Sequence, residues 1–279
     1  MRKLLLIGMI TFVAFFSLGT LVWFVHDQSN LPEERVEKTF HNKDIQDISI
    51  SGNRADIKIV QGKELKLKYK GQRPINFSEH NHILKISEDK KDEIAPNINP
   101  YKRTKQEMIV EVPKKQLNDI NISTDIGAIK LEGVQAATTT IWNNISDVHI
   151  KDSKLESVDM KSESSKLAFE NSTLKNGNFK IHSGGISGDH SLVKESIFIL
   201  GTGHINFSKM ANSCDIKAST KSGNITLSYL HPPKDTLLRL NPAEGKKLVK
   251  NPHFKNDKVG KGENVLEFYT NKGNITIRL

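Results

Sequence analysis

Two short motifs in the chain resemble the catalytic sequences of penicillin-binding enzymes. Residues 191–194 (SLVK) fit the S-x-x-K pattern that carries the serine nucleophile, and residues 221–223 (KSG) approximate the K-T-G motif. In those enzymes the nucleophile begins a helix in a mixed α/β fold, whereas both segments here fall on β-rich sequence. We therefore interpret both matches as products of repeat composition.

Metal-binding and acidic motifs are equally incomplete. Residues 184–189 (GGISGD) match part of a calcium-binding nonapeptide, but only once, and His80 and His82 lack an assignable third ligand. Clustered carboxylates could act on glycans. The acidic residues of the repeat do not recur in one column: Asp125, Glu132, Asp147, Asp152, Glu163, Asp189 and Asp215. The sequence thus assigns no catalytic, cofactor-binding or metal-binding residue, and a spatial cluster of carboxylates stays an alternative.

Basic residues are the strongest candidates for contact with a ligand. The chain has 41 Lys and Arg against 32 Asp and Glu, a formal charge of +9. Between residues 246 and 261 a single acidic residue, Asp257, accompanies six lysines: Lys246, Lys247, Lys250, Lys255, Lys258 and Lys261. A lysine near an anionic surface contributes about 1 kcal/mol. We predict contact with anionic lipid or wall polymer, the alternative being an ordinary solvated loop.

The N-terminus carries an uncharged segment from Leu4 to Val25. As a helix it would extend roughly 33 Å, enough to cross an apolar bilayer core of about 30 Å. Because Arg2 and Lys3 precede the segment, the positive-inside rule places the N-terminus in the cytoplasm and residues 28–279 outside. We predict a single-pass signal anchor through residues 4–25, with a cleaved signal peptide as the alternative. The extracytoplasmic location argues against nucleic acid as a partner.

The exported region alternates apolar and polar residues. Residues 28–39 are polar and contain Pro32, which predicts a stalk. Alternation with period two at residues 57–59, 65–70, 84–86 and 108–112 predicts half-buried strands across a β-rich segment, residues 40–115, interrupted by a charged loop at residues 89–103. A lone cysteine, Cys214, excludes a disulfide framework and is expected to be buried.

An internal repeat is the strongest signal in the chain. Aliphatic residues that follow a small residue by two positions recur every 19 or 20 residues: Ile129, Val148, Leu167, Ile186, Ile205 and Ile225. Seven positions earlier stands a second apolar column: Ile122, Ile141, Met160, Phe179, Phe198 and Ala218. Units of fixed short period stack and bury their apolar residues between neighbours. We predict an all-β protein with a parallel β-solenoid of about 19-residue coils, a β-sandwich of hairpins being the alternative.

The resulting organisation has five parts. They are a transmembrane signal anchor (1–27), a stalk (28–39), an N-terminal β-rich segment (40–115), the repeat solenoid (116–230) and a C-terminal loop with capping strands (231–279). The last part is needed because exposed strand edges at the end of a solenoid promote aggregation.

Recurring G-x-I-x-L units suggest a family. They read GAIKL at 127–131, GHINF at 203–207, SGNITL at 222–227 and KGNITIRL at 272–279. With the short N-terminal anchor, they resemble the bacterial "putative adhesin" β-repeat domain family of unknown function, and the layout is similar to its LiaG-like members. The resemblance implies a Gram-positive envelope location and a link to stress caused by cell-wall antibiotics. It carries no catalytic residues.

Three functional hypotheses follow. The first is a non-enzymatic binding or interaction module of the cell envelope, and the second is a membrane-tethered enzyme that acts on cell-wall glycans. A third makes the domain a regulatory partner of other membrane proteins of the envelope stress response, contacted through the anchor. An enzyme should show a cleft with converging carboxylates, whereas a binding module should show a flat or ridged surface with diffuse charge.

Overall fold

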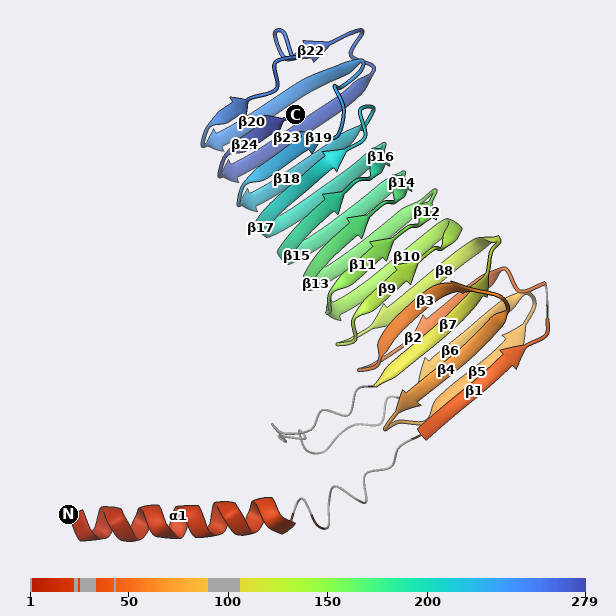
Figure 1. Cartoon of the computed structure of the whole chain (residues 1–279), viewed down its shortest axis with the longest axis vertical. Helices are drawn as coiled ribbons and strands as arrows, with labels where there is room; N and C mark the ends of the chain where they lie inside the picture. The colour runs from red at the N-terminus through yellow and green to blue at the C-terminus, as the bar shows by residue number, and fades with distance from the viewer. Residues whose placement is uncertain (1, 23–24, 26–33, 43, 90–105) are drawn as a thin grey trace.

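The computed structural model describes residues 2–22, 25, 34–42, 44–89 and 106–279. Within them the chain is mostly β, with one N-terminal helix and an elongated stack of strands that run across its long axis (Figure 1). The first half of the predicted stalk and residues 90–103 of the predicted loop lie outside the described residues.

The helix α1 (Arg2–Val22) is long and apolar enough to cross a membrane, a property that a signal sequence shares. None of its membrane-length window is buried against the rest of the chain. The hydroxyls of Thr11 and Thr20 donate to the carbonyls of Ile7 and Phe16, at 2.9 Å and 2.7 Å, and so are satisfied within the helix. Among the described residues, the buried hydrophobic core extends from Phe40 to Ile277, so we expect residues 34–279 to fold without α1.

Seven strands precede the repeat: β1 (Glu34–Phe40), β2 (Asp47–Ser51), β3 (Asp56–Gly62), β4 (Leu65–Gly71), β5 (Ile75–His80), β6 (Ile83–Glu88) and β7 (Glu107–Pro113). The stalk prediction was wrong for residues 34–39, because they form most of β1, which pairs antiparallel with β4 along its whole length. Val36 and Phe40 pack against the core, while charged residues between them face outward and gave the segment its polar appearance.

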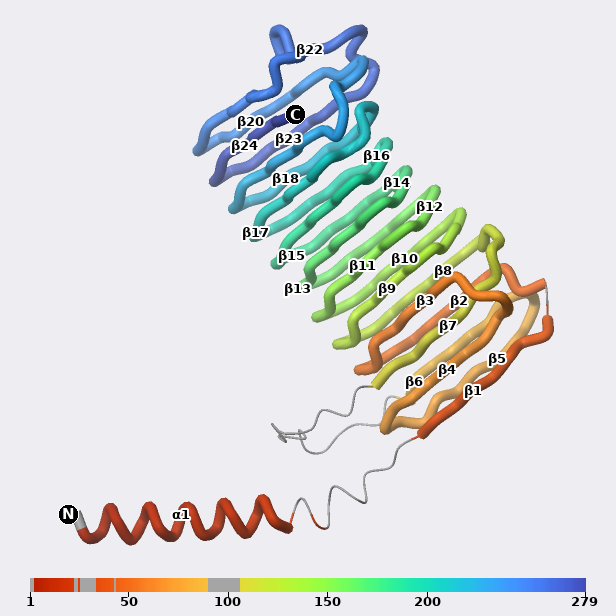
Figure 2. Tube along the Cα trace, in the orientation of Figure 1, coloured from red at the N-terminus to blue at the C-terminus, as the bar shows by residue number. Residues whose placement is uncertain are grey.

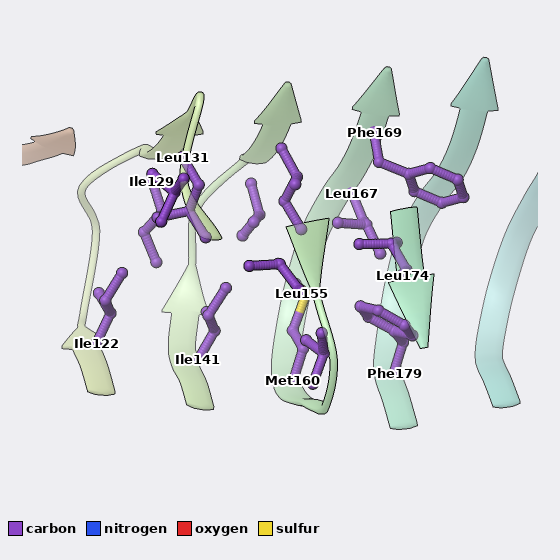
Figure 3. Packing of buried hydrophobic residues seen from close by; sticks show 14 of the residues in the cluster. Ile122, Ile129, Leu131, Ile141, Leu155, Met160, Leu167, Phe169, Leu174 and Phe179 are labelled. Carbon is purple, nitrogen blue, oxygen red and sulfur yellow. The ribbon is translucent and has the colours of Figure 1, made fainter. Parts of the chain in front are cut away.

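The repeat supplies twelve strands: β8 (Gln116–Thr124), β9 (Ile129–Glu132), β10 (Gln135–Ile145), β11 (Val148–Lys151), β12 (Lys154–Leu155), β13 (Val158–Glu170), β14 (Thr173–Lys175), β15 (Gly177–Asp189), β16 (Leu192–Lys194), β17 (Ser196–Met210), β18 (Ile216–Ser222) and β19 (Ile225–Tyr229). Neighbouring layers pair in parallel, and the two apolar columns predicted from the sequence face each other across the interior (Figure 3). In one ladder Ile141 is opposite Met160, and in the other Val148 is opposite Leu167. The Cα trace shows the layers as a solenoid-like stack (Figure 2).

The N-terminal segment continues the same two ladders rather than forming a separate unit. Strand β2 pairs in parallel with β8, so that Ile50, opposite Ile122, extends the second apolar column, and β3 pairs in parallel with β9. Strands β6 and β7 add one further layer beyond β2 and β3. Three antiparallel strands complete this end of the stack: β5 pairs with β6, β4 pairs with β7, and β1 pairs with β4.

The C-terminal end is also built out of chain order. Its strands are β20 (Thr236–Glu244), β21 (Lys247–Val249), β22 (Lys258–Val259), β23 (Asn264–Lys272) and β24 (Ile275–Arg278). The last two strands of the chain lie between earlier ones, because β23 pairs with both β18 and β20, and β24 with both β19 and β21. The terminal layer therefore consists of β20, β21 and the loop that follows β21, and strands β23 and β24 lie one layer inside.

Glycines at one corner of the stack permit this close spacing. Gly184, Gly203, Gly223 and Gly273 adopt φ between 136° and 150°, a region that side chains disfavour. A Cβ on Gly203 would lie 1.9 Å from the carbonyl oxygen of Gly184 in the preceding layer. Any larger residue would push two layers apart.

The corner predicts a position-specific effect of adding one methyl group. Gly203→Ala should lower the free energy of unfolding by at least about 2 kcal/mol, because it combines a strained backbone with a clash against another backbone atom. The neighbouring Gly185→Ala is the matched control, since its Cβ would meet only the His204 carbonyl oxygen, at 3.8 Å. That variant should unfold as the parent does or be stabilised by up to about 1 kcal/mol. Urea denaturation of both variants checks this, and equal losses would contradict it.

Candidate functional site

The six candidate lysines lie in the part of the chain that closes the C-terminal end of the stack. We call residues 246–261 the lysine segment; it begins at β21, crosses the end layer and includes β22. All six lysine side chains are exposed. The segment also borders a shallow hollow of about 410 Å³ lined in part by Lys250, Phe254 and Asp257.

A tight hairpin fixes two of these lysines. Lys255 and Lys258 exchange a pair of backbone hydrogen bonds, each 3.1 Å long. Between them Asn256 and Asp257 both adopt positive φ, 48° and 61°, as a two-residue type I′ turn requires. Asparagine and aspartate tolerate this conformation better than most residues, which explains why this dipeptide turns the chain here.

Side-chain contacts hold the lysine segment against the stack. The buried amide of Asn251 donates to the carbonyl of Arg278 at 3.3 Å, and the Lys261 N–H donates to the Asp235 carboxylate at 2.9 Å. The half-buried ring of Phe254 lies 6.3 Å from that of Tyr229 and packs against the core. The segment thus presents its lysines from an anchored backbone.

Most of the positive charge in this segment is uncompensated. Lys247 pairs with Asp257, and Lys261 approaches Glu263 at 4.0 Å with both side chains largely exposed. Exposed ion pairs of this kind contribute little stability. Within the part of the chain that the structure describes, no ion pair within 4.0 Å is formed by the remaining four: Lys246, Lys250, Lys255 and Lys258.

Comparison with known proteins identifies the domain. Residues 45–278, from just before β2 to the last strand, match the Toastrack family DUF4097. The chain belongs to the Toastrack family. The fold of this family is β-solenoid-like, in agreement with the stacked strands. No curated protein matches the chain.

The chain also matches solved structures of bacterial proteins. A "putative adhesin" from Parabacteroides distasonis is 13% identical, with a TM-score of 0.47, and the match covers 88% of this chain and 98% of that one. A "putative lipid binding protein" from the same species is 16% identical, with a TM-score of 0.42 and coverage of 89% and 97%. A "putative adhesin" from Bacteroides fragilis is 15% identical, with a TM-score of 0.39 and coverage of 89% and 98%.

The serine of the S-x-x-K match has a structural role in the Toastrack domain. The Ser191 hydroxyl donates to the Asp189 carbonyl at 2.7 Å and accepts the N–H of Ser172 at 3.1 Å. Ser172 makes the same two bonds one layer earlier, with Glu170 and Ser153. The hydroxyls form a ladder along one corner of the stack, which accounts for the recurrence of serine at this position.

The described residues give little geometric support for a metal site or for a pair of catalytic carboxylates. Among the described residues, no three His, Cys, Asp or Glu side chains gather closely enough to hold a metal ion. Asp47 and Asp119 are directly opposite in the β2–β8 register, a carboxylate pair that the sequence did not reveal. Burial, and then the charge of Asp47, raises the pKa of Asp119. Neither residue lines the hollows at the lysine segment, beside Trp142 or beside Phe40.

A hollow beside Trp142 is the second surface feature that the sequence interpretation missed. It has a volume of about 440 Å³ and lies on the outer face of β10, β13, β15 and β17. The prediction of the repeat rested only on its apolar, inward-facing positions. The residues one position after the second column, such as Trp142 after Ile141, point outward at the same spacing, and this offset was the signal that could have shown the hollow.

The single cysteine of the chain should be inert in the native protein. Cys214 is fully buried, and burial raises the pKa of its thiol to about 11, while the thiolate is the reactive form. We expect no labelling by a maleimide at pH 7.5 in the folded protein and complete labelling in guanidinium chloride. The thiol should also favour folding below pH 9 and lose this contribution as the pH rises through 11. Rapid labelling without denaturant would contradict the burial.

Proposed function

We propose that the protein is a non-enzymatic, membrane-anchored binding module of the cell envelope. In this proposal a parallel β-solenoid of about 19-residue coils forms a rigid ladder, and the lysine segment contacts anionic lipid or wall polymer. The anchored backbone and uncompensated charge of that segment support it most directly. Lysines attract anionic surfaces within about a Debye length, so the contact would weaken with salt.

The membrane part of the proposal rests on α1. Its apolar length, its unburied surface and its internally satisfied threonine hydroxyls suit a lipid environment. With Arg2 and Lys3 ahead of it, the segment at residues 4–25 would leave the N-terminus in the cytoplasm and the Toastrack domain outside.

The biological setting that we propose is the response to cell-wall antibiotics, as the LiaG-like layout implies. Other membrane proteins of that response are then candidate partners, reached through the anchor or the ladder. A membrane-tethered enzyme acting on wall glycans is the alternative, and a cleft with converging carboxylates would favour it.

Vesicle binding tests the lysine segment. Residues 34–279 should bind phosphatidylglycerol vesicles and purified teichoic acid at low salt, and neutral phosphatidylcholine vesicles weakly. Changing Lys246, Lys250, Lys255 and Lys258 to Gln should weaken anionic binding at least tenfold, since each lysine contributes about 1 kcal/mol. Co-sedimentation at several salt concentrations measures this effect.

A charge-matched variant separates the segment from net charge. It replaces four exposed lysines on other surfaces, none with an ion pair within 4.0 Å among the described residues: Lys85, Lys114, Lys154 and Lys166. Equal weakening by both variants would show that net charge alone acts. Absence of binding to every anionic surface would refute the contact and direct attention to a protein partner.

Labelling of intact bacteria tests the topology. Lys166 is exposed and the native Cys214 is buried, so Lys166→Cys introduces a single accessible thiol. A membrane-impermeant maleimide should label this variant in intact cells and leave the parent chain unlabelled, and the chain should remain in the membrane pellet after carbonate washing. Labelling only after lysis would reverse the orientation, and release into the medium would indicate cleavage.

A further inference from the structure

The ladder that pairs Ile141 with Met160 carries an unusual column of side chains on its outer face. In register across successive strands stand Trp142, Lys161, Lys180, Ile199, Ser219 and Tyr269. They face outward because the residues before them, the column that includes Ile141 and Met160, are buried. The side chains of Trp142 and Tyr269 are 50% and 45% exposed, which is high for aromatic residues on a rigid sheet.

The hollow beside Trp142 occupies one end of this column. Its lining includes Trp142, Lys161, Glu163, Lys180, His182 and Ile199. Trp142 and Ile199 are three strands apart, about 14 Å at the usual strand spacing. Apolar groups therefore stand at both ends of a floor that carries the two lysines.

The two lysines form a like-charge pair in direct register. Like charges opposite each other on neighbouring strands are destabilising. Two other positions pair opposite charges directly in register, Lys151–Glu170 at 3.6 Å and Lys217–Glu267 at 3.8 Å. Lys58–Lys130 and Lys175–Lys194 are further like-charge pairs, in which Lys58, Lys130 and Lys175 each have an ion pair with a carboxylate.

Only one of the two lysines has a compensating partner. Asp159, two residues before Lys161 on the same strand, lies 3.3 Å from its ammonium. Among the residues that the structure describes, Lys180 has no ion pair within 4.0 Å. An anion bound over the floor of the hollow would relieve the repulsion between the two lysines.

We infer that this hollow binds an acidic saccharide. The negative face of the indole attracts the weakly positive C–H groups of a sugar ring, so the ring would stack on Trp142. Its carboxylate or phosphate would lie on Lys161 and Lys180, while Glu163 and His182 offer hydrogen-bonding groups for hydroxyls. The site lies away from the lysine segment and does not depend on the function proposed for it.

Tryptophan fluorescence reads this site directly. The chain has two tryptophans, so Trp23→Phe leaves Trp142 as the sole reporter in the full chain in detergent micelles. A galacturonic acid tetramer or glucose 6-phosphate should change its emission saturably, and the two probes distinguish a carboxylate from a phosphate ligand. Neutral chitotetraose and inorganic phosphate alone should bind at least fivefold more weakly. Equal binding of either control would overturn the inference, as would absence of binding by both acidic sugars.

Variants assign the binding to the hollow. Lys180→Gln should weaken binding of the better acidic probe about five- to tenfold and reduce its salt dependence, whereas Lys166→Gln, an exposed lysine on another face, should leave it unchanged. Trp142→Ala, followed by calorimetry and checked for folding by circular dichroism, should abolish binding. Equal affinities for the two lysine variants, or full binding by folded Trp142→Ala, would refute the site.

Discussion

Direct stacking of one layer on the next is the constraint from which the rest of this Toastrack domain follows. When parallel strands keep one register, a side chain inside the stack must fit the side chain at the same position above and below. The rings of Phe179 and Phe198, with centroids 4.6 Å apart and planes only 3° from parallel, show how closely neighbours match. The same rule gives the glycine corner and the serine ladder, because the backbone distance between layers leaves no room for larger groups.

The ends of the stack explain why the chain does not follow it in simple order. An open parallel ladder presents unpaired backbone groups that invite association with another chain. At one end β2 and β3 lie between the repeat and the layer made by β6 and β7, and at the other β23 and β24 lie inside β20 and β21. The first and last layers therefore pair with strands that do not directly precede or follow them in the sequence. The charged edge strand β1 and the anchored lysine segment then cover the edges.

The sequence made the interior more predictable than the ends. Apolar columns recur at fixed spacing, so the partners of Met160 and Leu167 could be named from the sequence, and the structure pairs them as expected. Pairings between distant segments leave no such period: β18 and β23 are 50 residues apart, and β1 looked polar because only one of its faces is buried. The lysine segment could be named as a candidate from the sequence because its lysines lie close together in the chain. The Trp142 hollow could not be named in this way, because its residues come from four strands and differ in type.

In such a stack the register leaves side chains free to vary only on the outer faces and at the two ends. Functional surfaces can therefore lie only there. The lysine segment is an end surface and the Trp142 hollow an outer-face surface, and both carry lysines without an ion pair among the described residues. Lys180 on β15 is four strands from β20, about 19 Å along the stack. The stack therefore holds the hollow and the end layer a few strands apart, so a polymer bound at one surface would be present at high effective concentration near the other. Weak individual contacts could then add to a stable attachment without any deep pocket.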